Sequence, residues 1–120
     1  MTVELNTQAF EHAKQLIEQG KFVFDDRDMW SEHQPSEQAE NEYLKEHGFD
    51  EYGKWFLGID TEHHKNTKGR YKFPYGDFEK VHRGGVISAE SRAGQYKYVD
   101  IEHAAHQLHK MIDAATKRKK

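Results

Sequence analysis

The segment from residue 71 to residue 94 constrains the fold of this chain more than any other. It reads YKFPYGDFEKVHRGGVISAESRAG and combines four aromatic residues, a proline, four glycines and seven charged residues. Such a segment is too irregular for one long helix or one long strand, because proline and glycine interrupt both. It is also too rich in aromatic residues for a linker. The segment therefore predicts a junction where a strand, a turn and a helix meet.

The start of this segment has the alternation of an extended strand. Tyr71, Phe73 and Tyr75 alternate with Lys72 and Pro74, so the three rings are predicted to share one face. A proline has no N–H to donate, which restricts the strand to the edge of a sheet.

The other elements are predicted from hydrophobic periodicity and from residues that cap helices or form turns. In chain order they are a helix at 7–19, a strand at 21–25, a helix at 36–47, a strand at 54–59, a turn at 75–77, a strand at 78–83, and helices at 86–96 and 101–116. We expect the strands at 21–25, 54–59 and 78–83 to form a small antiparallel sheet. The last two helices are expected to form a C-terminal helical hairpin. The predicted fold class is therefore α+β and helix-dominated, with one globular domain at 1–116 and a basic frayed tail at 117–120.

The last helix has the clearest amphipathic pattern. Its apolar residues lie within about 60° of Leu108 on a helical projection; they are Ile101, Ala104, Ala105, Leu108, Met111, Ile112 and Ala115. We expect Leu108 at the centre of the buried face. Asn6 or Thr7, Ser36 and Asp100 are expected to cap the three longest helices.

Length and cysteine content narrow the class of protein. A chain of 120 residues is expected to form one domain, and the absence of cysteine excludes disulfides and thiolate metal sites. A cysteine-free chain favours the cytoplasm. No stretch has the pattern of a signal peptide or the roughly 20 apolar residues that span a bilayer.

Several motifs resemble a family of small bacterial proteins of uncharacterised function. They are YGKWFLGID at 52–60, KFPYGDF at 72–78, KVHRGGV at 80–86 and ESRAGQY at 90–96. The resemblance extends from the first helix to the last. It implies a bacterial source and a complete protein, and it implies no activity, ligand or catalytic residue.

One candidate ligand site surrounds the glycine pair. Its residues are Asp77, His82, Arg83, Gly84, Gly85 and Arg92. A histidine with carboxylates can perform acid–base chemistry, and free backbone N–H groups at a helix start can bind an anion. The alternative is structural: the two arginines pair with Asp77 or Glu90 and hold the segment against the last helix. We favour the structural interpretation.

Histidine is abundant, with nine in the chain. His103, His106 and His109 follow one another at spacings of three on the last helix, and imidazole is a common ligand of divalent transition metals. Three histidines on one helix need a second element to complete a tetrahedron, which His63 and His64 are candidates to supply. Surface histidines with no cofactor are the favoured interpretation. The acidic residues near Asp25 are likewise interpreted as a solvated loop.

Charge is distributed unevenly. Residues 80–120 contain nine Lys and Arg against four Asp and Glu, whereas the rest contains nine against seventeen. We expect a small cytosolic bacterial accessory or binding protein without catalysis, whose partner is an unknown protein or small molecule rather than a membrane. The alternative is a metal- or anion-binding enzyme that uses His82 and its neighbouring carboxylates. The third possibility, a nucleic-acid-binding helical hairpin, is disfavoured by the acidic N-terminal two thirds.

Overall fold

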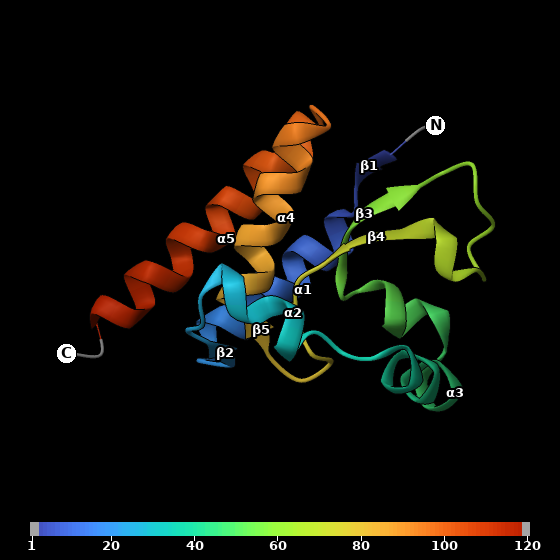
Figure 1. The fold of residues 1–120 in the computed structure, drawn as a ribbon, viewed down its shortest axis with the longest axis horizontal. Helices are drawn as coiled ribbons and strands as arrows, with labels where there is room; N and C mark the ends of the chain where they lie inside the picture. The colour runs from blue at the N-terminus through green and yellow to red at the C-terminus, as the bar shows by residue number, and fades with distance from the viewer. Residues whose placement is uncertain (1–2, 119–120) are drawn as a thin grey trace.

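The two C-terminal helices lie on one side of the molecule and a small sheet lies on the other, with the N-terminal helix between them (Figure 1). A computed structural model describes residues 3–118. Its α-helices are α1 (Thr7–Glu18), α2 (Trp30–His33), α3 (Glu37–Gly53), α4 (Arg83–Gln95) and α5 (Val99–Arg118). Its strands are β1 (Val3–Leu5), β2 (Phe22–Val23), β3 (Phe56–Asp60), β4 (Tyr71–Pro74) and β5 (Val81–His82). Short 3-10 turns occur at Arg27–Met29 and Lys68–Arg70. The α+β, helix-dominated fold class is confirmed.

The sheet is built from different strands than the sequence predicted. β3 is central, and it pairs antiparallel with β1 on one side and β4 on the other. β2 and β5 form a separate pair of two residues each, and they run parallel. The predicted sheet of 21–25, 54–59 and 78–83 was therefore wrong. Both edges of β3 are already occupied, so neither β2 nor β5 has an edge of β3 available for pairing.

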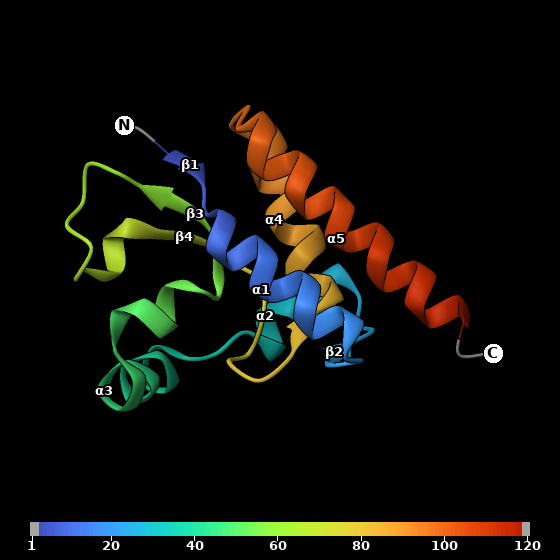
Figure 2. The same cartoon turned by 180° about the vertical axis from the view of Figure 1, so that it is seen from behind.

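Helices α1, α4 and α5 form the main core. Figure 2 shows α1 in front of α4 and beside α5. Small side chains, among them Ala13, Ala89 and Ala105, are fully or almost fully buried, which allows the helix axes to approach closely. Leu108 has no exposed surface, so its predicted place in the core is confirmed. None of the helices in the described part of the chain is long and apolar enough to cross a bilayer.

Two of the predicted helix caps are confirmed and the third has another role. The Asn6 side chain accepts a hydrogen bond from the Ala9 N–H, and Ser36 Oγ accepts one at the start of α3. Asp100 lies inside the first turn of α5 rather than before it. Its carboxylate accepts hydrogen bonds from the N–H groups of Ile101 and Leu5. Asp100 therefore fastens β1 to the start of α5.

Helix α3 continues beyond its predicted end. Gly48 has φ 82° and ψ 172°, a conformation that interrupts the helix as predicted, but the chain then resumes helical turns as far as Gly53. Helix α5 also extends past its predicted end to Arg118, which includes the first two residues of the predicted frayed tail. The other two residues of that tail, 119 and 120, lie outside the described residues.

Helix α4 begins three residues earlier than predicted, at Arg83. The glycine pair does not interrupt regular secondary structure but lies in the first turn of this helix. A Cβ atom on Gly84 would lie 2.4 Å from the Asp26 carbonyl oxygen, and one on Gly85 would lie 2.9 Å from that of Tyr75. Both glycines are therefore required for close packing of the helix start.

The rings of β4 do not share one face. Phe73 has a φ of 63°, which a bulky residue rarely adopts, and this interrupts the strand alternation. The Tyr71 ring packs near Phe49 and the Phe73 ring near Tyr98, whereas Tyr75 is fully buried. The prediction of a shared aromatic face was wrong because it assumed regular extended backbone.

Candidate functional site

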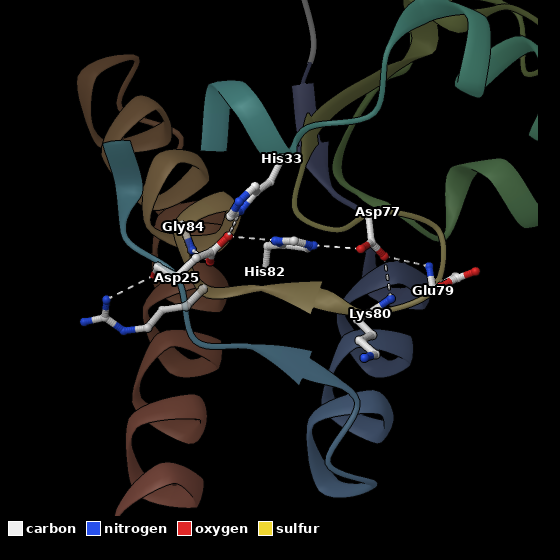
Figure 3. A network of polar contacts seen from close by, with 8 residues as sticks. Asp25, His33, Asp77, Glu79, Lys80, His82 and Gly84 are labelled. Atoms are coloured by element: carbon white, nitrogen blue, oxygen red, sulfur yellow. Dashed lines mark hydrogen bonds and ion pairs between the residues drawn. The ribbon is translucent and has the colours of Figure 1, made fainter. Parts of the chain in front are cut away.

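His82, at the end of β5, lies between two carboxylates (Figure 3). Its Nδ1 is 2.7 Å from Asp25 Oδ2, and its Nε2 is 2.8 Å from Asp77 Oδ2. Only 5% of the residue is exposed. Ionised carboxylates only accept hydrogen bonds, so both ring nitrogens carry a proton and donate it. The ring is therefore a buried imidazolium that links two segments of the chain.

Asp25 holds the start of α4 as well as the histidine. Its Oδ1 accepts a hydrogen bond of 2.7 Å from the Gly84 N–H, and its Oδ2 also accepts one of 2.7 Å from His33 Nδ1. The N-terminus of a helix is the positive end of its dipole, which stabilises this carboxylate. Asp25 therefore acts as a cap for α4, supplied by the loop that follows β2.

Asp77 is positioned by the turn that precedes β5. Its Oδ1 accepts hydrogen bonds from the backbone N–H groups of Glu79, at 3.0 Å, and Lys80, at 2.7 Å. Such bonds from the local backbone are typical of an aspartate in a turn, and the sequence predicted a turn at 75–77. The turn thereby fixes the second oxygen, Oδ2, against His82 (Figure 3).

Two rings cover His82. The Trp30 ring lies 5.5 Å from the His82 ring, and the His33 ring lies 5.4 Å from it, each measured between centroids. Trp30 is itself buried. Helix α2, which carries both residues, therefore covers the His82 ring and reduces its contact with solvent.

The electrostatics agree with a charged histidine. Burial alone would lower the pKa of His82, but hydrogen bonds to Asp77 and Asp25 outweigh it, and the pKa is raised. Burial would raise the pKa of Asp77, but hydrogen bonds from His82 and from the backbone of Lys80 and Glu79 lower it to about 2. The pKa of Asp25 is lowered in the same way, since bonds from Gly84 and two histidines overcome its burial.

This geometry limits what the predicted anion or acid–base site can do. His82 has no free ring nitrogen, so it offers neither a lone pair nor a spare proton to a substrate. The Gly84 N–H, expected to be free for an external anion, already binds Asp25. The site is therefore filled by the protein's own carboxylate.

Arg83 points to other partners than the sequence suggested. Its Nε donates to Asp113 Oδ1 at 2.9 Å, and its guanidinium lies over the Phe24 ring at 4.6 Å from the centroid. A longer bond of 3.4 Å reaches the Asp25 carbonyl. The expected pairing of Arg83 with Asp77 or Glu90 was wrong, although the pinning of this segment to the last helix is confirmed.

Arg92 lies apart from His82, on the side of α4 that lines a cleft of about 410 Å³. The cleft is bounded by α2, β4, the end of α4 and the turn into α5. Five aromatic residues line it: Trp30, Tyr71, Phe73, Tyr96 and Tyr98. Trp30 thus contacts the His82 network and also lines the cleft.

The charged residues that line the cleft are basic. Lys72 and Arg92 line it, and no acidic residue lines it within the described part of the chain. Its volume lies in the range typical of small-molecule sites. Phe73, with its left-handed backbone, also belongs to the wall. Strained backbone of this kind is concentrated at ligand sites.

The predicted metal ligands are not brought together as a set. His63 and His64 lie in the loop between β3 and β4, on the far side of the molecule from α5 (Figure 1). His103 is exposed on α5. His106 and His109 instead meet Glu90 of α4, with Nδ1 to carboxylate distances of 2.7 Å and 3.1 Å.

Comparison with protein-family models, curated proteins and solved structures finds no match for this chain. The resemblance to small bacterial proteins therefore stays a prediction.

Sequence reasoning missed Asp25 and His33 as partners of His82, and it missed the cleft. Asp25 and His82 are 57 residues apart, and no local pattern connects them. One feature of the sequence pointed to Asp25: it follows a short apolar run, at the start of a loop. An aspartate in such a position can cap a helix from another part of the chain. The cleft had no such signal, since its wall comes from separate segments between residues 3 and 98.

Proposed function

We propose that this protein binds a small, flat organic anion in the cleft between β4, α2 and the end of α4, without catalysing its conversion. The observation that carries the proposal is the composition of the wall: five aromatic residues, with Lys72 and Arg92 as the charged groups. Aromatic walls favour planar ligands, and cations placed in an apolar wall favour a carboxylate or phosphate.

The state of His82 supports binding rather than chemistry. Its two nitrogens are engaged by Asp25 and Asp77, so its role is to hold α2 and α4 in place behind Trp30. A preorganised wall reduces the conformational entropy lost on binding. The cysteine-free sequence and the resemblance noted above support a cytoplasmic, bacterial setting for this role.

The test uses 2-naphthoate as a flat anionic probe and 2-naphthalenemethanol as its uncharged counterpart. We expect 2-naphthoate to shift the NMR signals of the Trp30 indole N–H and the Arg92 amide in ¹⁵N-labelled protein. Arg92→Gln and Lys72→Gln should each weaken its binding by about five- to tenfold, the usual loss of one charge-assisted contact.

The matched control is Lys45→Gln, which removes an exposed cation from α3 outside the cleft. It should leave the affinity for 2-naphthoate unchanged. The proposal fails if the uncharged probe binds as tightly as the anion, or if the shifted signals map to another surface.

A further inference from the structure

A second cluster of side chains lies on the face of α4 that points away from the cleft. Glu90 and Arg92 are about 200° apart around this helix, so a ligand at Arg92 does not reach Glu90. Glu90 faces α5, where His106 and His109 are three residues apart and thus on neighbouring positions of one face. The cluster therefore joins the two helices of the C-terminal hairpin.

The three side chains offer a suitable set of ligand atoms. His106 Nδ1 lies 2.7 Å from Glu90 Oε2, and His109 Nδ1 lies 3.1 Å from Glu90 Oε1. One ligand atom from each residue lies within 4.8 Å of the other two. In a tetrahedral zinc site the ligand atoms are about 3.3 Å apart, given bonds of about 2.0 Å, so small side-chain rotations suffice.

A further carboxylate orients one of the imidazoles. His109 Nε2 lies 3.4 Å from Asp113 Oδ2, and the other oxygen of Asp113 accepts a hydrogen bond of 2.9 Å from Arg83 Nε. A carboxylate behind the second nitrogen is the usual companion of a metal-bound histidine, because it keeps the proton on that nitrogen and leaves the first free for the metal. Asp113 is thus a positioning residue.

We propose that Glu90, His106 and His109 bind one Zn²⁺ ion, with a fourth position open to water. The ion takes the Nδ1 lone pair of each histidine, so each imidazole binds in its neutral form with the proton on Nε2. The ion connects α4 to α5 and stabilises the hairpin. Access is direct, because 57% of the His106 side chain is exposed.

The second group with a similar composition, Asp25 with His33 and His82, is the less suitable one. Asp25 lies at the positive end of α4 and already binds the Gly84 N–H. A cation there would face both the helix dipole and the neighbouring Arg83. His82 is also buried beneath Trp30, so it is not directly open to solvent.

The test is calorimetric titration of the metal-free protein with Zn²⁺, combined with the visible spectrum of the Co²⁺ form. We expect one ion per chain, a Co²⁺ spectrum typical of four-coordination, and a rise in melting temperature with Zn²⁺. His106→Gln and Glu90→Gln should each weaken Zn²⁺ binding by at least about 100-fold, and Asp113→Asn by about 10- to 100-fold.

Two controls make the assignment specific. His103→Gln removes an exposed histidine from the same helix, and it should leave Zn²⁺ affinity unchanged. His33→Gln removes the accessible histidine of the competing group, and it should also have no effect. Circular dichroism of each metal-free variant verifies that it is folded. The proposal is overturned if no single-site binding is seen, if His106→Gln binds Zn²⁺ like the wild type, or if His33→Gln abolishes binding.

Discussion

The Gly84 N–H donates a hydrogen bond of 2.7 Å to Asp25 Oδ1, across 59 residues of sequence. The first turn of α4 is thereby capped by a side chain from the loop after β2, because its own N-cap residue, His82, provides no side-chain cap. The same carboxylate binds His82 and His33. One aspartate therefore connects the loop, the helix and the imidazolium.

Asp25→Asn tests this connection. The amide keeps one oxygen for the Gly84 N–H but places an NH₂ group against two imidazole nitrogens, and it removes a charge paired with His82. We expect a loss of about 3 kcal/mol in the free energy of unfolding, as for other broken buried ion pairs. Asp26→Asn is the matched control, since 84% of its side chain is exposed, and it should change stability by less than about 0.5 kcal/mol. Urea unfolding measures both, and equal effects would contradict the assignment.

The free energy of unfolding should depend on pH through His82 and Asp77. The pKa of His82 is raised above 6.5 in the folded state, so its contribution is complete below pH 6.5 and is lost as the pH rises through the folded value. The pKa of Asp77 is about 2 instead of 3.8, so its contribution is complete above 3.8 and is lost as the pH falls toward 2.

His12 acts in the opposite direction, because burial lowers its pKa, so total stability is not a clean readout for His82. NMR titration of the ring protons measures each histidine separately. The His82 midpoint should lie above 6.5 and the His12 midpoint below it. A His82 midpoint below 6.5 would show that the ring is neutral between its two carboxylates.

Asn6 holds three elements together and allows a selective test. Its Oδ1 caps α1, and its Nδ2 donates to the carbonyl oxygens of Gly53 and Phe56 at 2.9 Å and 3.0 Å. Asn6→Asp retains the cap but directs a carboxylate oxygen at two carbonyls, and it should destabilise by about 2–4 kcal/mol. Ser36→Asp, at the exposed cap of α3, should stay within about 0.5 kcal/mol of wild type. Similar losses from both changes would mean that capping alone matters at Asn6.

Leu108→Ala should destabilise the protein by about 2–5 kcal/mol, the usual effect of truncating a fully buried leucine. Leu108 has no exposed surface and packs in the core between α5 and its neighbours. Gln107→Ala, on the exposed side of the same helix, controls for helix propensity and should have little effect. A denaturant midpoint unaffected by Leu108→Ala would place this face of α5 outside the core.

Arg83→Lys should lower stability by about 1 kcal/mol in the free protein. Lysine keeps the charge but loses the planar group that bonds Asp113 and stacks on Phe24. Arg27→Lys, an exposed arginine, should have no measurable effect. The melting temperatures should be compared with and without phosphate. If Arg83→Lys melts like the wild type yet loses a stabilising effect of phosphate, Arg83 holds a ligand rather than the structure.

The parts of the fold that the sequence predicted are those encoded locally. The apolar arc around Leu108, the caps at Asn6 and Ser36, and the turn at Asp77 each involve residues a few positions apart, where periodicity and side-chain chemistry decide the outcome. The apolar arc around Leu108, the cap at Asn6 and the turn at Asp77 also contribute to the core or to the candidate site.

The parts that could not be predicted depend on pairing between distant segments. β1 has only three residues, too few for a periodic signal, yet it takes one edge of β3. The glycine pair looked like a helix breaker, and only the approach of Asp26 and Tyr75 explains it as packing. Similarly, Glu90 and the histidines of α5 meet only once the hairpin closes, so their spacing on one helix did not identify the cluster.

The left-handed backbone of Phe73 has a consequence for solubility. β4 forms an outer edge of the three-stranded sheet, and such edges recruit strands from other molecules when they are long, flat and rich in free N–H groups. Here the strand bends at Phe73 and ends at Pro74, which has no N–H to offer. The opposite edge, β1, is three residues long. Within the described residues, neither border of this three-stranded sheet offers a foreign strand a long, straight template for edge-to-edge pairing.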